Sequence, residues 1–208
     1  MKPILFNTQM VQAILEGRKT TTRRIAKDIK SLEVREGGFV TGKAEDKYRC
    51  TFFSGNQRQV AEKLSGYKVG DILYVRETWM IQSMKNFEKN IKFLYKAEPQ
   101  ELKEVHVSSE IYEKLIKFES KNGWQPSLFM PKEAARIFLR VKNVKIERLQ
   151  DITEEGIRAE GITEEFPPHA RDKFQELWDS TTKEYRWRLN PWVWVIEFER
   201  IDKSEVDQ

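Results

Sequence analysis

Residues 17–24 read Gly17-Arg18-Lys19-Thr20-Thr21-Thr22-Arg23-Arg24, and they directly follow a segment with helical spacing. The stretch holds four cations and three hydroxyls but no carboxylate. Arginine offers planar donor forks to phosphates or base edges, lysine a point charge with an adjustable pKa, and threonine a nucleophile or a phosphate donor. An isolated basic loop is usually a solvated surface, so the interpretation depends on its surroundings.

The segment before this basic stretch predicts a strand and a helix. Ile4-Leu5-Phe6 is a short apolar run, and Asn7 or Thr8 is a suitable helix cap. The apolar positions that follow lie on one helical face, and Gly17 is a typical terminator. We therefore expect a strand at 4–6 and a helix that ends at Gly17.

The middle of the chain alternates between ordered and polar segments. Residues 68–77 contain a Gly-Asp turn and an apolar, β-branched run, which predicts a strand. Residues 31–66 and about 83–121 are polar and weakly periodic, so we interpret them as surface insertions. Within them, Tyr48–Phe53 and Ile91–Lys96 are candidate strands.

The last third has clearer periodicity. Residues 124–131 contain two prolines and predict an extended segment. Ala135–Leu149 alternates as one long strand with a kink near Asn143, and a helix capped by Asp151 or Thr153 runs to Glu160 and stops at Gly161. A second helix is expected at 169–179 and a final strand at 192–199, with a frayed tail at 202–208.

Short strands with long connections and few helices predict an α+β fold, a small β-barrel decorated by helices. Nothing repeats and no flexible linker divides the chain. One domain over residues 1–208, with the two insertions, is the simplest interpretation.

Composition limits the class of protein. The chain has 208 residues, a net charge of +4, 39% hydrophobic residues and six tryptophans. The single Cys50 cannot form an internal disulfide, which favours a reducing compartment. We find no signal peptide and no apolar run of membrane length, so we expect a cytoplasmic protein that does not enter membranes.

The order of motifs resembles the ASCH domain family, which has the barrel of the PUA-like superfamily. A longer set of motifs is similar to the ASCH-type proteins of phages and prophages. The resemblance covers nearly the whole chain apart from 31–66 and 85–120. Its first motifs are Gly17–Arg24, Val69-Gly70-Asp71, Leu149–Glu155 and Trp194–Phe198, and the longer set adds Tyr74–Trp79, Met130–Arg136 and Asn190-Pro191-Trp192.

This resemblance implies binding of RNA or an unusual base in a cleft. Some small ASCH proteins are amidohydrolases that deacetylate N4-acetylcytidine with a Lys, a Thr and a Glu. By motif position these residues match Lys19, Thr22 and Glu160, which are our candidate catalytic residues. Those enzymes are about half this length, so the insertions are a departure from the pattern. Another branch is described as metal-dependent ribonucleases.

Further candidates for ligand binding come from the same motifs and their neighbours. Each has a structural alternative, because arginines often make surface ion pairs and tryptophans usually pack in the core. Glu160 stands near a helix C-terminus, where an anion is disfavoured. The candidates are Arg18, Arg23, Arg24, Arg76, Glu77, Trp79, Trp124 and Arg136.

The sequence leaves several functions open. The chain is expected to bind RNA or a modified nucleoside, either as an amidohydrolase or as a non-catalytic binding module. A metal-dependent ribonuclease and a phage morphogenesis or interaction protein are alternatives. His106 and His169 have no zinc spacing, and Gly37-Gly38 is not a phosphate loop, so we expect neither a metal site nor a nucleotide cofactor. The oligomeric state is open.

Overall fold

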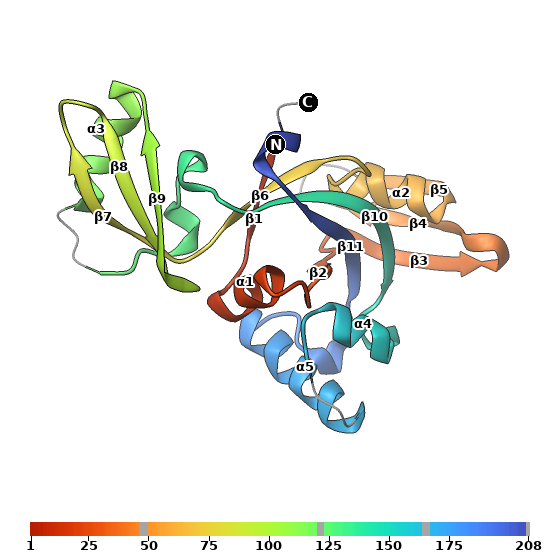
Figure 1. Ribbon diagram of the computed structural model, residues 1–208. Coiled ribbons are helices and arrows are strands. Elements are labelled where there is room, and N and C mark those ends of the chain that lie inside the picture. The colour runs from red at the N-terminus through yellow and green to blue at the C-terminus, as the bar shows by residue number, and fades with distance from the viewer. Residues whose placement is uncertain (46–49, 120–122, 164–166, 207–208) are drawn as a thin grey trace. The chain divides into compact units, whose positions relative to one another are not determined.

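The computed structural model describes residues 1–45, 50–119, 123–163 and 167–206. The chain forms two compact units, each assembled from segments that are distant in sequence (Figure 1). Unit 1 consists of Met1–Gly17, Ile72–Leu139 and Arg200–Gln208, and unit 2 consists of Arg18–Asp71 and Arg140–Glu199. The expectation of a single domain stays a prediction.

Three sheets hold the described strands. The strands are β1 (Lys2–Leu5), β2 (Thr21–Ile25), β3 (Ile29–Arg35), β4 (Phe39–Glu45), β5 (Cys50–Asn56), β6 (Ile72–Arg76), β7 (Trp79–Lys85), β8 (Asn90–Tyr95), β9 (Glu98–His106), β10 (Phe138–Arg148) and β11 (Trp192–Ile201). Their orders are β1-β6-β10-β11-β2, β3-β4-β5 and β7-β8-β9. In place of the expected barrel, the five-stranded sheet is open, with β1 and β2 as its edge strands.

The helices confirm the α+β class. They are α1 (Thr8–Leu15), α2 (Gln57–Ser65), α3 (Ser109–Glu119), α4 (Glu154–Ala159) and α5 (Pro167–Thr181). Short 3-10 turns are η1 (Glu36–Gly38), η2 (Ser127–Phe129), η3 (Lys132–Ala134), η4 (Leu149–Asp151), η5 (Trp187–Leu189) and η6 (Lys203–Glu205). None of the described helices has both the length and the apolar character that a membrane crossing requires.

Unit 1 begins with the predicted strand and helix. Strand β1 pairs in parallel with β6, with Lys2 opposite Leu73. The Asn7 side chain caps α1 by accepting a hydrogen bond from the Met10 amide at 2.8 Å. Gly17 follows the helix at a φ of 74°, a left-handed conformation that glycine adopts without strain. The sequence predicted these elements correctly.

The insertion expected at 83–121 is a folded layer of unit 1. Strands β7, β8 and β9 form an antiparallel sheet, and α3 contacts β7 (Figure 1). Alternate residues of β8 are buried, as its period-two pattern requires. The predicted strand at 91–96 is therefore confirmed. The apolar cluster of the unit contains Tyr74, Trp79, Ile91, Phe93, Tyr95, Val107, Tyr112, Leu115, Met130 and Phe138.

The insertion expected at 31–66 also has regular structure. Strands β3, β4 and β5 form an antiparallel sheet, and α2 contacts β4 and β5 (Figure 1). Strand β5 confirms part of the expected strand at 48–53, although residues 48 and 49 lie outside the described residues. Each sheet of an insertion buries one face and exposes the other. Because the exposed face carries polar residues, these segments are polar and weakly periodic in the sequence, which favours their interpretation as insertions.

In the rest of unit 2, α4, α5 and β11 follow the predicted elements, whereas the basic stretch expected as a loop contains strand β2. Strand β2 pairs antiparallel with β11, and α4 and α5 enclose a core with residues of β11. Thr153 caps α4, since its hydroxyl accepts a hydrogen bond from the Gly156 amide at 3.1 Å. The core contains Leu149, Ile152, Ile157, Ala170, Phe174, Trp178, Val193 and Val195.

The tail differs from the expectation of a frayed end. Asp202 caps η6, and the Glu205 side chain accepts a hydrogen bond from the Asp202 amide at 3.2 Å. Val206 packs against the apolar cluster of unit 1. Residues 207–208 lie outside the described residues.

The packing of β4 predicts that Gly42→Ala disrupts the β3-β4-β5 sheet. A Cβ atom on Gly42 would collide with the Ser31 carbonyl oxygen and the Phe53 ring. Overpacking of this kind costs about 1–3 kcal/mol. Hydrogen exchange of the amides in β4 and β5 should therefore become roughly 5- to 150-fold faster. Ser54→Ala, on the exposed positions of β5, is the control. Unchanged exchange in the Gly42 variant would contradict the structure of this sheet.

Candidate functional site

The basic stretch leads into β2. Its backbone is hydrogen-bonded on one side to the end of α4 and on the other side to β11. Lys19 and Glu160 form an isolated antiparallel bridge, and the Thr20 amide donates to the Ala159 carbonyl at 2.9 Å. On the other side, the Phe198 amide donates to the Thr20 carbonyl at 2.8 Å. Backbone hydrogen bonds therefore fix the stretch in place, in contrast to a mobile solvated loop.

Lys19 is a buried ammonium with an acceptor for each of its protons. Its Nζ donates to the Thr21 carbonyl at 2.8 Å, to the Glu160 carbonyl at 3.1 Å and to Glu160 Oε2 at 2.5 Å. The residue is 2% exposed. Burial lowers the pKa of Lys19, Glu160 opposes this shift, and the nearby charges of Arg24 and Arg23 add to it.

Glu160 accepts from a second cation of the basic stretch. Arg23 Nη1 donates to Glu160 Oε1 at 3.0 Å, while Nη2 and Nε donate to Glu147 Oε1 at 2.8 and 3.0 Å. Glu160 is the C-cap residue of α4, so its carboxylate lies near a helix end where the dipole disfavours an anion. The two cations compensate that unfavourable position.

The two faces of β2 have different surroundings. Arg23 lies on the face that meets α5, with its guanidinium 6.0 Å from the centre of the Phe174 ring. Thr22 and Arg24 alternate with Arg23 and therefore lie on the opposite face. Their cross-strand partners on β11 are Ile196 and Trp194. Thr22 is 3% exposed and Arg24 is half-buried.

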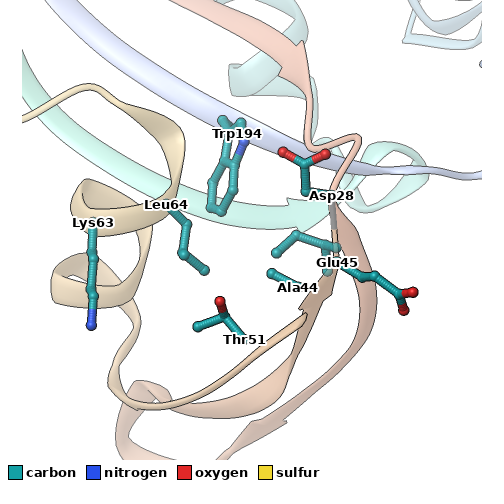
Figure 2. A pocket seen from close by; sticks show the side chains of 8 residues that line it. Asp28, Ala44, Glu45, Thr51, Lys63, Leu64 and Trp194 are labelled. Atoms are coloured by element: carbon teal, nitrogen blue, oxygen red, sulfur yellow. The ribbon is translucent and has the colours of Figure 1, made fainter. Parts of the chain in front are cut away.

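A pocket of about 220 Å³ lies on the same face as Thr22 and Arg24, because Trp194 is one of its walls. Figure 2 shows Trp194, Leu64 and Thr51 turned toward the space and the Asp28 carboxylate beside the indole ring. The described residues provide no hydrogen bond or ion pair to that carboxylate. The remaining walls are Ile29, Ala44, Glu45 and Lys63.

The structure thus brings three predicted cations and one predicted carboxylate together in unit 2. Lys19 and Arg23 hold Glu160, and the charge of Glu160 also opposes the lowering of the Arg24 pKa, which burial causes. Arg18 lies near them, with Nη1 donating to the Gly161 carbonyl at 2.5 Å. Thr22 shares β2 with this cluster.

The other predicted residues belong to unit 1. Arg136 makes a bidentate pair with Glu77, at 2.9 and 3.0 Å, and also contacts Glu98 and Glu101. Its guanidinium lies 4.3 Å from the centre of the Tyr95 ring. Burial raises the pKa of Glu77, and the bonds from Arg136 oppose that rise.

The remaining predicted residues of unit 1 have structural partners. Arg76 Nε donates to the Met130 carbonyl at 2.8 Å. Trp79 is fully buried, with its ring tilted against Phe93 and Phe118, so we interpret it as core packing in place of a stacking platform. Trp124 is 37% exposed and is available for contacts.

Sequence reasoning missed Glu147, Asp28 and Trp194 as members of the site. Glu147 occupies a polar position near the end of a predicted strand, which gives no signal of its partner. Trp194 buries most of its surface, as tryptophans usually do, and it also lines the pocket. Within the described part of the chain, no group of three or more metal-ligating side chains occurs.

We predict that replacement of the Glu160 carboxylate greatly lowers the free energy of unfolding. Glu160→Gln leaves the buried Lys19 without its counter-charge and Arg23 with Glu147 alone, which costs about 3–5 kcal/mol. Urea unfolding followed by circular dichroism should report this loss. Glu154→Gln, on the exposed side of α4, is the matched control. A Lys19→Met/Glu160→Gln double variant should recover part of the loss, and equal effects of Glu154→Gln and Glu160→Gln would contradict the assignment.

Comparisons with known proteins give limited information. The sequence matches no family model and no curated protein. A similar solved structure is that of protein EF3133 from Enterococcus faecalis V583, described as family-model DUF984. It is 11% identical, the match covers 95% of this chain and 71% of that chain, and the TM-score is 0.38. Values this low support no argument about function.

Proposed function

We propose that this protein binds RNA or a modified nucleoside through unit 2, at the pocket beside Trp194. The observation that carries the proposal is the pairing of Arg24 with Trp194 across β2 and β11. It puts a cation of the basic stretch on the same sheet face as the pocket. A volume of about 220 Å³ is below the roughly 300–1,000 Å³ of sites for drug-sized ligands, so the pocket suits a single ring system.

The chemistry of the walls suits a base with an exocyclic amine. Trp194 and Leu64 offer apolar contact, and the Asp28 carboxylate accepts hydrogen bonds from an amine. Arg24 provides the donor fork that a phosphate of the same ligand requires. The resemblance of the sequence motifs to the ASCH-type proteins of phages and prophages is part of this proposal, since it implies the same class of ligand.

The contact between Lys19 and Glu160 favours a second function, hydrolysis of the amide of an N4-acylated cytidine. A lysine acts as a base only when its pKa is lowered and its proton has an acceptor. Burial lowers the pKa of Lys19, and Glu160 Oε2 is 2.5 Å away. These two features support a proton-transfer pair.

In the proposed reaction the Thr22 hydroxyl attacks the amide carbonyl carbon. This step requires the Thr22 hydroxyl to reach Lys19 Nζ, which contacts Glu160 together with Arg23. Lys19 then passes a proton to Glu160 and takes the hydroxyl proton, so that a tetrahedral oxyanion forms. The carbon–nitrogen bond then breaks, and the leaving amine takes the proton from Lys19. Cytidine is released and Thr22 carries the acyl group. Water hydrolyses that ester, which releases the carboxylic acid and restores Thr22.

The matched pair Thr22→Val and Thr21→Val tests the reaction. Both threonines are buried on β2, but they lie on opposite faces. Thr22→Val should reduce turnover of N4-acetylcytidine by about 100-fold or more, because the nucleophile is lost, while Thr21→Val should remain active. Chromatographic detection of cytidine and acetate measures both. Equal activity of the two variants would refute the role of Thr22, and turnover by neither variant nor the parent would leave binding as the function.

Binding is tested by Arg24→Gln and Asp28→Asn. Arg24→Gln should weaken binding of single-stranded RNA and reduce the slope of log affinity against log salt by about 1. Asp28→Asn removes a negative charge, so affinity for the RNA backbone should rise while the preference for bases with an exocyclic amine falls. Lys142→Gln, an exposed cation elsewhere in unit 2, is the control.

The other outcomes of these assays separate the alternatives. RNA fragments that disappear with a chelator would indicate a metal-dependent ribonuclease. A stable protein partner without nucleic-acid affinity would indicate a morphogenesis or interaction protein, and it would overturn the binding proposal.

A further inference from the structure

Three lysines from separate elements of unit 1 surround one pocket. Lys103 comes from β9, Lys132 from η3 and Lys203 from η6. The pocket has a volume of about 240 Å³, and Glu133 is the carboxylate among its walls. The local charge is therefore strongly positive.

Part of the lining of this pocket is apolar, and we call this part the apolar floor. Val105 comes from β9, Phe138 from the start of β10, and Val206 follows η6. These residues belong to or pack against the apolar cluster of unit 1, so the floor is continuous with the core. A ligand in this pocket would contact both apolar side chains and ammonium groups.

The side chains of the three lysines form no ion pair among the described residues. Lys132 and Lys203 have neither a hydrogen bond nor an ion pair from their side chains among the described residues. The nearby carboxylates of Glu98 and Glu101 contact Arg136. Lys103 donates to the Ala135 carbonyl, which is neutral. Burial lowers the pKa of Lys103 to about 8, Lys203 and Arg136 add to this effect, and Glu101 opposes it.

We propose that this pocket binds a small organic anion, with an anionic head held by Lys103, Lys132 and Lys203 and a single ring or short chain on the apolar floor. Aryl and alkyl phosphates and carboxylates have this chemistry. The site lies wholly in unit 1 and shares no residue with the nucleoside site of unit 2. A negative result for this site would therefore say nothing about the proposed function, and a negative result for the proposed function would say nothing about this site.

The two parts of the ligand make separate contributions. An anion among like-charged ammonium groups relieves their mutual repulsion. The apolar part of the ligand gains stability in proportion to the apolar area that it buries. An inorganic anion makes only the ionic contacts, and an uncharged ring makes only the apolar contacts, so a ligand with both parts should bind most tightly.

Calorimetric titration of the full chain with phenyl phosphate tests the proposal. Phenyl phosphate should bind at least about tenfold more tightly than inorganic phosphate, which lacks the apolar ring, or phenol, which lacks the anionic head. Lys203→Gln and Lys132→Gln should each weaken binding about threefold to tenfold through loss of one ionic contact. Both side chains are exposed, so the variants should fold. Lys85→Gln, an exposed lysine of β7 outside the pocket, is the control.

Proton uptake gives an independent readout for Lys103. Burial lowers its pKa toward the working pH range, and an anion raises that pKa again. Binding near pH 8 should therefore take up protons, which titrations in buffers of different ionisation enthalpy measure. Lys103→Met should remove this uptake. Because phenyl phosphate titrates near neutral pH, benzoate is the parallel probe, and it distinguishes a carboxylate site from a phosphate site.

Three results would overturn the proposal. Equal affinity for inorganic phosphate and phenyl phosphate would remove the role of the apolar floor. Equal effects of Lys203→Gln and Lys85→Gln would show that binding occurs elsewhere. Absence of binding by phenyl phosphate and benzoate at millimolar concentration would refute the site.

Discussion

The carboxylate of Glu160 is the charge on which unit 2 depends. It lies at the end of α4, where a carboxylate is poorly placed, and it is almost fully buried. Lys19 and Arg23 make that position stable, and Arg23 extends the contact to Glu147 on β10. A buried charge that loses one partner is costly. The network therefore fixes the start of β2 against α4, and the register of β2 with β11 places Thr22 and Arg24 on the same sheet face as Trp194.

Unit 1 contains an ion-pair network in which one cation contacts several carboxylates, the reverse of the arrangement around Glu160. One cation, Arg136, contacts the carboxylates of Glu77, Glu98 and Glu101. Its planar guanidinium lies on the Tyr95 ring and keeps a bidentate geometry with Glu77, which lysine could not reproduce. The carboxylates of Glu98 and Glu101 thus pair with Arg136. The charge of Arg136 also adds to the lowering of the Lys103 pKa, which Glu101 opposes.

The sequence predicted the elements whose apolar pattern is strong. Strands β1, β6, β8, β10 and β11 and helices α1, α4 and α5 follow from periodicity and from caps such as Asn7 and Thr153. The two inserted sheets were harder to predict, because each buries a single face. The family resemblance related Lys19 to Glu160, and the structure brings them into contact. Long-range partners such as Arg23 with Glu147 depend on the fold of α4, β2 and β10, which local pattern does not encode.

The same contact that stabilises Lys19 also limits its chemistry. An ammonium that donates all three protons cannot accept another, so a basic role requires transfer of one proton to Glu160. Arg23 opposes that transfer, because it stabilises the carboxylate as an anion. Burial favours it, because a neutral amine and a neutral carboxyl group lose less solvation than an ion pair. Arg24 acts on both partners, because its charge disfavours the Lys19 ammonium and favours the Glu160 carboxylate. Its two effects on the proton transfer oppose each other, so burial and Arg23 decide how readily Lys19 becomes a base.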